Sequence, residues 1–311
     1  MNIIEDGVRP TFGGHEKFVF RNGWLKKGVD AVINDQHVFT NDNSLVTLGV
    51  GKNMVRSIRH WCLATGMLSE TGKTPQTRLL QVTPLAQSLI VKGGWDPFFE
   101  DIGTLWLLHW QLVSNQTRSL VWYATFSAFL EAEFSKKQLA AFLAKQFEHS
   151  GIRTTLGMIE REVDCCLRTY VPARTKLGTI SEEGLDCPLA ELDLIRYTQE
   201  DNVYRFNIGP KLSLPVEIFG YALLTFLSKI AVERRSIGID ECIYHYGSPG
   251  QAFKLDENTV VDYLEKLEIV TNNYLQLRDT AGLRQIYIHE TLGDSLKNFA
   301  SELLGTYYGQ N

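Results

Sequence analysis

The segment from residue 51 to residue 65 constrains the fold more than any other stretch of this chain. At about 100° per residue, one arc of a helical wheel collects side chains that can be buried. They are Met54, Val55, Ile58, Trp61 and Cys62. A second arc holds Lys52, Arg56 and Arg59, with Asn53 and His60 beside them. The segment is therefore predicted to be a helix with one buried face and one cationic face.

Basic residues gather in and around this helix although the whole chain is acidic. The net charge is −5 over 311 residues. Residues 51–92 carry +5, since six bases oppose the single acid Glu70, and the remainder must carry −10 (−5 minus +5). The bases are Lys52, Arg56, Arg59, Lys73, Arg78 and Lys92. A cationic surface on an acidic body predicts an anionic ligand, with DNA as the first candidate.

The flanking segments predict a winged helix-turn-helix. Residues 24–34 have the pattern of a short amphipathic helix, and residues 37–39 and 45–48 are predicted as short β pieces. Residues 67–69 and 78–82 enclose a turn and predict a β-hairpin. After it, Thr83-Pro84 supplies an N-cap and a first-turn proline for a helix to residue 91. Helix, helix and hairpin in this order are typical of a recognition helix backed by a wing.

The rest of the chain is predicted to be mostly helical. Four helices are expected between residues 101 and 171, at 102–113, 119–133, 135–149 and 154–170. Their aromatic side chains recur at helical spacing, which favours a packed core over a stacking surface for bases. A hairpin is then expected at 192–197 and 202–208, followed by a helix at 215–232. A second helix–helix–hairpin unit is expected at 239–246, 256–267, 269–277 and 283–289.

These elements predict a mainly α-helical protein with small β-hairpin wings. We expect a winged-helix DNA-binding domain at 1–92, a helical domain at 93–175 and a winged-helix-like domain at 176–311. The middle helix of the last domain carries more acids than bases, so we expect it to pack on protein rather than on DNA. Its charged residues are Glu257, Asp262, Glu265, Glu268 and Lys266.

Several classes of protein and site are disfavoured. No apolar run reaches the ~18–20 residues of a membrane span, and the N-terminus lacks the pattern of a secretory signal, so a cytoplasmic protein is expected. The five cysteines form no CxxC pair and are expected to be buried thiols. The segment 49–53 lacks the first glycine and the hydroxyl of a phosphate-binding loop, which argues against nucleotide triphosphate binding.

The residue types on the predicted recognition helix suit DNA. Arg56 and Asn53 are candidate base readers, since arginine pairs with guanine edges and asparagine with adenine edges. Lys52 would add its charge to a helix N-terminus that already favours phosphate. Further candidate DNA contacts are Arg59, Lys26, Lys27, Lys73 and Arg78. The alternative is that these bases only solvate the helix, as bases on most helices do.

The segment 12–21 contains an unusual His15-Glu16 pair between glycines and Arg21. It does not form the zinc motif HExxH, because position 19 is valine. It could form a strained polar site or a structural anchor, and the anchor is favoured. No metal-ligand spacing and no catalytic site follow from the residue types alone.

The same motifs resemble those of a known family. They are Phe12-Gly-Gly-His-Glu-Lys-Phe18, Arg21-Asn-Gly-Trp-Leu-Lys-Lys-Gly28, Leu48-Gly-Val-Gly-Lys-Asn-Met-Val55 and Ile58-Arg-His-Trp61. The chain resembles SspB-type proteins of bacterial DNA phosphorothioation systems, which replace a phosphate oxygen with sulfur as an epigenetic and anti-phage mark. The resemblance covers most of the chain, with its specific motifs in the first 62 residues.

The resemblance implies a DNA-binding protein that nicks one strand for sulfur insertion. It implies partners that comprise a cysteine desulfurase, an ATP-dependent sulfurtransferase with an iron–sulfur cluster, and an ATPase. A nickase would use a divalent metal, Mg²⁺ or Mn²⁺. His15, Glu16 and Arg21 are then the candidates for a site acting on phosphate, as base or ligand, orienting group and charge stabiliser.

Two other functions stay open. A non-catalytic DNA adaptor would recruit the sulfurtransferase through the acidic C-terminal half. A winged-helix transcription regulator would bind as a symmetric dimer with tight sequence specificity. Plasmid nicking separates the nickase from both alternatives.

Overall fold

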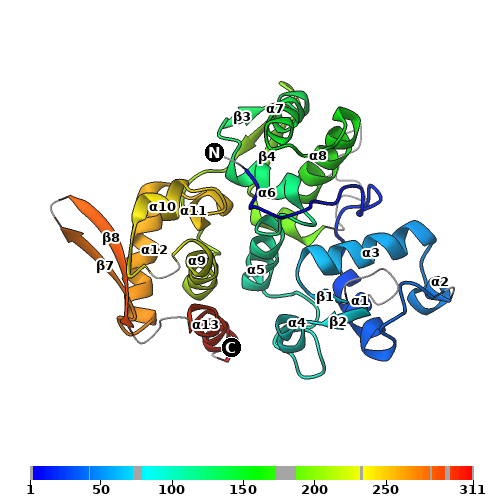
Figure 1. The fold of residues 1–311 in the computed structure, drawn as a ribbon, viewed down its shortest axis with the longest axis horizontal. Helices are drawn as coiled ribbons and strands as arrows, with labels where there is room; N and C mark the ends of the chain where they lie inside the picture. Colours follow the sequence, from blue (N-terminus) through cyan, green and yellow to red (C-terminus); the bar gives the residue numbers. More distant parts are fainter. Residues whose placement is uncertain are drawn as a thin grey trace. The chain divides into compact units, whose positions relative to one another are not determined.

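The computed structural model describes residues 3–41, 43–72, 79–172, 187–231, 234–280, 282–290 and 295–309 (Figure 1). The chain forms two compact units. The first comprises Met1–Thr125 and Phe129–Phe206, and the second comprises Phe126–Ala128 and Asn207–Asn311. Within the described residues the fold is mainly helical with three small antiparallel sheets. The division into three domains at 92/93 and 175/176 stays a prediction.

The first unit begins with three helices, a hairpin and a fourth helix. They are α1 (Trp24–Asn34), α2 (Ser44–Leu48), α3 (Lys52–Ala64), β1 (Leu68–Thr71), β2 (Leu79–Val82) and α4 (Pro84–Leu89). β1 and β2 pair antiparallel as predicted. Thr83 caps α4, because its Oγ1 accepts the Ala86 N–H at 3.2 Å.

The predicted β pieces at 37–39 and 45–48 are wrong. The first is a turn and the second lies within α2. Val46 and Thr47 are β-branched, which suggests a strand, but a helix this short shows too little periodicity to be recognised. Gly49 ends α2 in the left-handed conformation with φ 62°, and Gly51 then starts α3 from extended backbone. A tight turn therefore joins α2 to α3.

α1 packs against α3 at Gly28. A Cβ at this position would lie 2.4 Å from the Cys62 sulfur and 3.1 Å from Ile58 Cγ2. Only a glycine lets the two helices approach this closely without a shift. Val55, Ile58, Trp61 and Cys62 are buried, which confirms the predicted apolar arc of α3 apart from the half-buried Met54.

The remainder of the first unit is a helical body with a small sheet. Its elements are α5 (Ile102–Val113), α6 (Leu120–Ser127), β3 (Glu133–Phe134), α7 (Lys136–His149), α8 (Leu156–Tyr170), the 3-10 helix η2 (Pro188–Leu192), β4 (Ile195–Thr198) and β5 (Val203–Phe206). The sheet order is β3-β5-β4. The aromatic side chains of α5 and α6 are buried, which confirms a packed core.

The second unit is built around α9. Its elements are α9 (Val216–Ile230), β6 (Ser236–Gly238), α10 (Ile239–Tyr244), α11 (Pro249–Ala252), α12 (Glu257–Val270), β7 (Leu275–Thr280), β8 (Leu283–Ile288) and α13 (Leu296–Gly309). α12 and α13 both pack on α9, and Phe219 stacks on Tyr263 with ring centroids 4.7 Å apart. The sheet order is β6-β8-β7.

Helix α6 contributes to both units, because its last two residues belong to the second one. Lys254 Nζ donates to the Phe126 carbonyl at 2.6 Å, and the Gly247 N–H donates to Ser127 Oγ at 3.0 Å. Burial lowers the pKa of Lys254 to about 7. The second unit thus encloses a segment from the middle of the chain.

Two predicted boundaries are wrong for identifiable reasons. The helix expected at 119–133 ends at Ser127, because residues 133–134 pair with β5 as strand β3. The strand expected at 269–277 begins at Leu275, because α12 continues to Val270. Asn272 and Asn273, with φ 49° and 62°, then turn the chain. The sequence patterns also missed β6 and α13.

Candidate nucleic-acid interface

The exposed face of α3 begins at its first turn. Lys52, Asn53 and Arg56 are exposed, and the first turn of the helix contains no acid. Gly51 at the N-cap provides no side chain to satisfy the first backbone N–H groups of the helix. The N-terminal end of α3 therefore combines free backbone donors, two cations and one amide on one side of the helix.

Acids accompany the cations of this face. Arg56 Nη1 lies 3.2 Å from Glu16 Oε1, and the Arg56 side chain is still 57% exposed. An exposed pair of this kind contributes little to stability, so phosphate can displace Glu16 at low cost. Arg56 is the more available of the two arginines.

Arg59 is bound more firmly than Arg56. Its guanidinium pairs with Glu70 of β1, and the other oxygen of Glu70 pairs with Arg118. The Glu70 side chain is 17% exposed. The one acid of the cationic segment therefore bridges two arginines and fixes the direction of Arg59. The sequence pattern predicts Arg59 as a DNA contact but gives no sign of this bridge.

The two lysines predicted on α1 have structural contacts of their own. Lys26 pairs with Asp30 at 2.8 Å and lies over the Phe98 ring. Lys27 donates to the Leu48 carbonyl at the end of α2, at 3.1 Å. Lys73 and Arg78, the predicted bases of the wing, lie outside the described residues.

The loop around His15 contacts two helices that are distant in the sequence: Glu162 of α8 accepts the Gly13 N–H, and Ser57 of α3 donates to the His15 carbonyl. His15 is 1% exposed, and its Nδ1 accepts the Lys17 N–H at 3.0 Å. Its Nε2 lies 3.2 Å from Oε1 of Glu162 on α8, off the direction of a hydrogen bond, while that oxygen accepts the Gly13 N–H. Glu16 has φ 49° and Lys17 φ 67°, so the loop is strained. Its contacts suit an anchor, which the sequence patterns favoured.

His60, on the inner side of α3, faces the same loop. Its ring centroid lies 5.8 Å from that of His15 and 5.2 Å from that of Trp61. Burial, and after it the charges of His15, Arg118 and Arg59, lower the pKa of His60 to about 3. A Cβ on Gly14 would lie 2.4 Å from His60 Nδ1, so the loop rests directly on the imidazole. His60 is a neutral core residue.

Arg21, the third residue assigned to a phosphate site, has different neighbours. Its guanidinium lies over the rings of Phe18 and Trp24, 5.7 and 5.5 Å from their centroids. Glu16 pairs with Arg56, and His15 Nε2 lies near Glu162 without the geometry of a hydrogen bond. The contacts named here join His15, Glu16 and Arg21 to different residues.

The five cysteines are buried, as expected from their number and spacing. Burial raises the pKa of the Cys62, Cys165 and Cys166 thiols, and raises that of Cys242 to about 12. A sulfur carrier requires an accessible thiolate. These thiols are therefore unsuited to carrying sulfur themselves.

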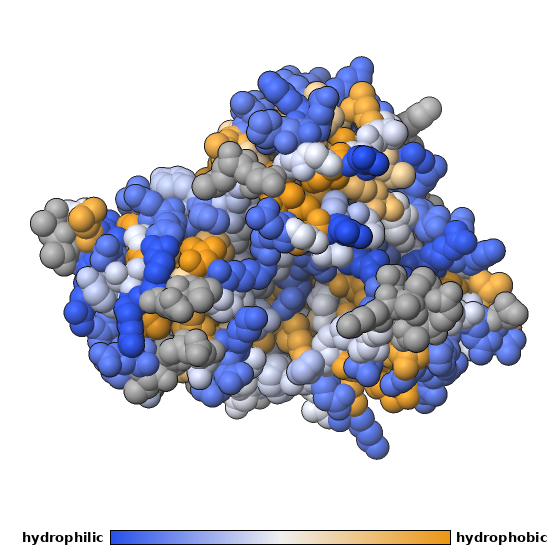
Figure 2. Space-filling view, in the orientation of Figure 1, coloured by the Kyte–Doolittle hydropathy of each residue, from blue (hydrophilic) through white to orange (hydrophobic). Residues whose placement is uncertain are grey.

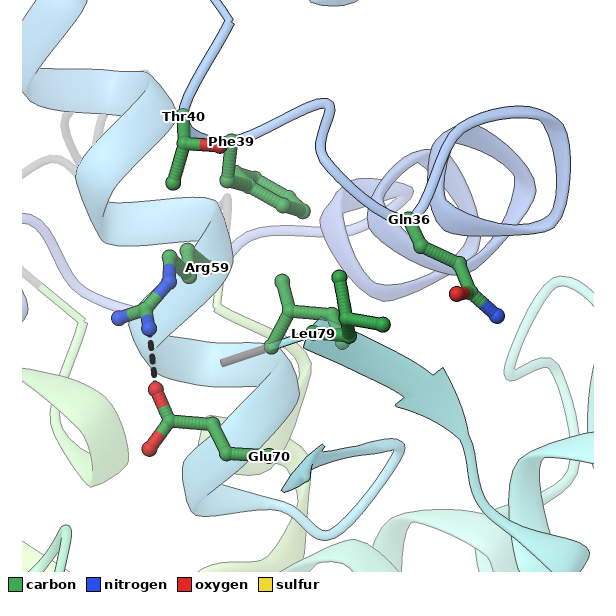
Figure 3. A pocket seen from close by; sticks show the side chains of 7 residues that line it. Gln36, Phe39, Thr40, Arg59, Glu70 and Leu79 are labelled. Carbon is green, nitrogen blue, oxygen red and sulfur yellow. Dashed lines mark hydrogen bonds and ion pairs between the residues drawn. The ribbon is translucent and has the colours of Figure 1, made fainter. Parts of the chain in front are cut away.

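A pocket of about 190 Å³ opens beside Arg59 (Figure 3). Its lining comes from the segment after α1, from α3 and from both strands of the hairpin. The residues are Gln36, Phe39, Thr40, Arg59, Glu70, Leu79 and Leu80. Figure 3 shows Phe39 and Leu79 facing the same space, with the Arg59–Glu70 pair at one side of it.

Comparisons with known proteins support the sequence resemblance. Residues 12–308 match the family described as "Protein of unknown function (DUF4007)". Two solved structures, an SspB crystal structure and a magnesium ion-bound SspB crystal structure, each align with a TM-score of 0.86 and 30% identity over 97% of this chain and 89% of theirs. The chain is an SspB-type member of this family. No curated protein matches it.

The magnesium ion of one SspB structure raises the question of a metal site here. In the parts of this SspB-type chain that the structure describes, no three His, Cys, Asp or Glu residues group as metal ligands would. His15 and Glu162, which lie 3.2 Å apart, are both buried, and Glu162 accepts the Gly13 N–H of the loop. These two residues are therefore not available as metal ligands. In the same described parts, no helix has the length and apolar character of a membrane span.

Proposed function

We propose that this SspB-type chain binds DNA in a phosphorothioate-modification system, with α3 as the recognition helix of an N-terminal winged helix. The single observation that carries the proposal is the exposed, acid-free first turn of α3 with Lys52, Asn53 and Arg56. The order α1, α2, α3, β1, β2 supports it, because it is the order of a winged helix.

Each exposed group has a role in this proposal. Lys52 and the free N–H groups of α3 bind phosphate, and Asn53 and Arg56 read base edges. Two apolar side chains of α2, the helix that precedes α3, are exposed: Leu45 by 41% and Val46 by 82%. Figure 2 shows a hydrophobic area at this edge of the first unit. Mixed polar and apolar contacts of this kind are typical of groove binding.

The place in a modification system follows from the similarity to SspB. The partners in the proposal are the cysteine desulfurase, the sulfurtransferase and the ATPase that sulfur insertion requires. Because the buried thiols are unsuited to carrying sulfur, the chain contributes DNA binding and leaves sulfur transfer to its partners.

DNA binding is tested by Lys52→Ala/Arg56→Ala in titrations of a labelled duplex at several salt concentrations. We expect weaker binding and a log–log salt slope reduced by about 0.9 for each phosphate contact removed. Lys137→Ala/Lys145→Ala, on the exposed face of α7, removes the same charge elsewhere and is the matched control. Equal effects of the two double variants would refute a specific role of α3.

Strand nicking is the second part of the proposal, and the resemblance to SspB-type proteins supports it. Purified protein with Mg²⁺ or Mn²⁺ should convert supercoiled plasmid to open circle. Plasmid that stays supercoiled, together with intact DNA binding and a stable complex with the sulfurtransferase, would instead identify an adaptor.

A further inference from the structure

The pocket beside α3 has a composition that suits a flat heterocycle. Phe39, Leu79 and Leu80 supply an aromatic and an aliphatic wall. Arg59 and Glu70 place a guanidinium and a carboxylate at one side, so that hydrogen-bond donors and an acceptor lie next to each other (Figure 3). At about 190 Å³ the pocket lies below the range of drug-sized ligand sites, which begins near 300 Å³. It suits a single ring system.

The position of the pocket connects it to the cationic face of α3. Arg59 follows Arg56 by three residues and so lies one turn further along the same side of the helix. Glu70 pairs with both Arg59 and Arg118, so its negative charge beside the pocket is compensated. A compensated carboxylate tolerates a phosphate backbone nearby, whereas the apolar walls exclude the phosphate itself.

The ion pair with Glu70 makes Arg59 less available to phosphate than Lys52 and Arg56 on the same helix. The Glu70 side chain is only 17% exposed, and phosphate would have to displace it from Arg59. Arg59 is therefore poorly suited to binding phosphate. Left in place, the pair offers both donors and an acceptor to the edge of a base. Bases that have left the stack are recognised in this way, by an aromatic face together with contacts to the edge.

We propose that this pocket binds one unstacked nucleobase of the DNA that α3 engages, with Phe39 against its face and the Arg59–Glu70 pair at its edge. The assignment rests on the proposed DNA binding and specifies what the same surface recognises. A base in an intact duplex stays stacked, so the pocket binds a base only in single-stranded or locally opened DNA.

Phe39→Leu tests the assignment, because it keeps an apolar side chain but removes the ring. Binding of a labelled single-stranded oligonucleotide is measured beside the same sequence as a duplex. We expect single-strand affinity to fall about tenfold, within the range for loss of one stacking contact, and duplex affinity to change less than twofold. Phe39→Tyr should restore single-strand binding.

Phe299→Leu is the matched control, since Phe299 is, like Phe39, a half-buried phenylalanine, and it lies on α13 outside the pocket lining. Phe39 Cζ lies 3.7 Å from the position of a Cβ on Gly28, so Phe39 also touches α1. Equal losses of single-strand and duplex binding would mean that Phe39 only supports the helices, and would overturn the assignment.

The remaining outcomes separate this assignment from the proposed function. Unchanged single-strand affinity in Phe39→Leu, with binding still lost in Lys52→Ala/Arg56→Ala, overturns the base pocket and leaves DNA binding intact. A wild-type protein that binds neither form of DNA overturns both. Binding of free deoxynucleotides that depends on Phe39, without a loss of single-strand affinity, would assign the pocket to a free nucleotide and overturn the DNA assignment.

Discussion

Acid should destabilise the first unit through His60. The pKa of this imidazole falls from its ordinary 6.5 to about 3, chiefly because burial removes the imidazolium from water. The unfolded chain therefore binds a proton below pH 6.5, whereas the folded chain does so only near pH 3. Stability that depends on neutral His60 is complete above pH 6.5 and is lost progressively as the pH falls towards 3.

The magnitude follows from the linkage between protonation and unfolding. Between the two pKa values the slope approaches ~1.4 kcal/mol per pH unit. From pH 7.5 to pH 5 the free energy of unfolding should fall by about 2 kcal/mol through this one group. His60→Phe keeps an uncharged ring, so the fall in its free energy of unfolding over the same pH interval should be about 2 kcal/mol smaller than in the wild type.

Tryptophan fluorescence is the assay, because it reports on the first unit. All six tryptophans precede residue 125, the last residue of the first segment of that unit. Urea unfolding is followed at both pH values for the wild type, His60→Phe and His149→Phe, the last an exposed histidine on α7 as control. An equal loss of unfolding free energy in the wild type and in His60→Phe would show that burial does not lower the pKa of His60.

One further variant tests the packing of the first unit, and another tests the pH dependence of the second. Gly14→Ala would place a Cβ 2.4 Å from His60 Nδ1 and should cost about 1–3 kcal/mol in urea unfolding, whereas Gly157→Ala on α8, with open space around it, should cost nothing. Lys254→Met should remove a rise in stability of the second unit between pH 7 and 10.5, where the unfolded lysine is protonated and the folded one is not. Hydrogen exchange of α9 and α12 at both ends of this interval measures the effect, and an equal rise in the variant would contradict it.

Local patterns predicted the helices well where periodicity and capping agreed. α1 and α5 begin and end as expected, and α3 differs from its prediction by one residue at each end. α1 and α3 have several turns and a clear apolar arc, which is the strongest signal a sequence carries. α5 is apolar on nearly every side, and its start is marked by Asp101, whose side chain caps the helix. α2 failed because five residues span little more than one turn, so its β-branched side chains outweighed a weak helical period.

The candidate interface was predictable only in part, because its ion pairs join distant residues. The cationic face of α3 is a local pattern, and it could be found on a helical wheel. Glu16 lies 40 residues before Arg56, and Arg118 lies 48 residues after Glu70. No local pattern links such residues, so the sequence could not distinguish the available Arg56 from the bridged Arg59.

Because helix α6 contributes to both units, the gene cannot be cut between them without removing contacts from each fragment. A fragment that starts at residue 207 would lack the Phe126 carbonyl that accepts the Lys254 ammonium and the Ser127 hydroxyl that accepts the Gly247 N–H. A fragment that ends before residue 207 would keep residues 126–128 without the partners that enclose them. Neither half is a self-contained module, so recombination between relatives should favour exchange of the entire gene over exchange of either part.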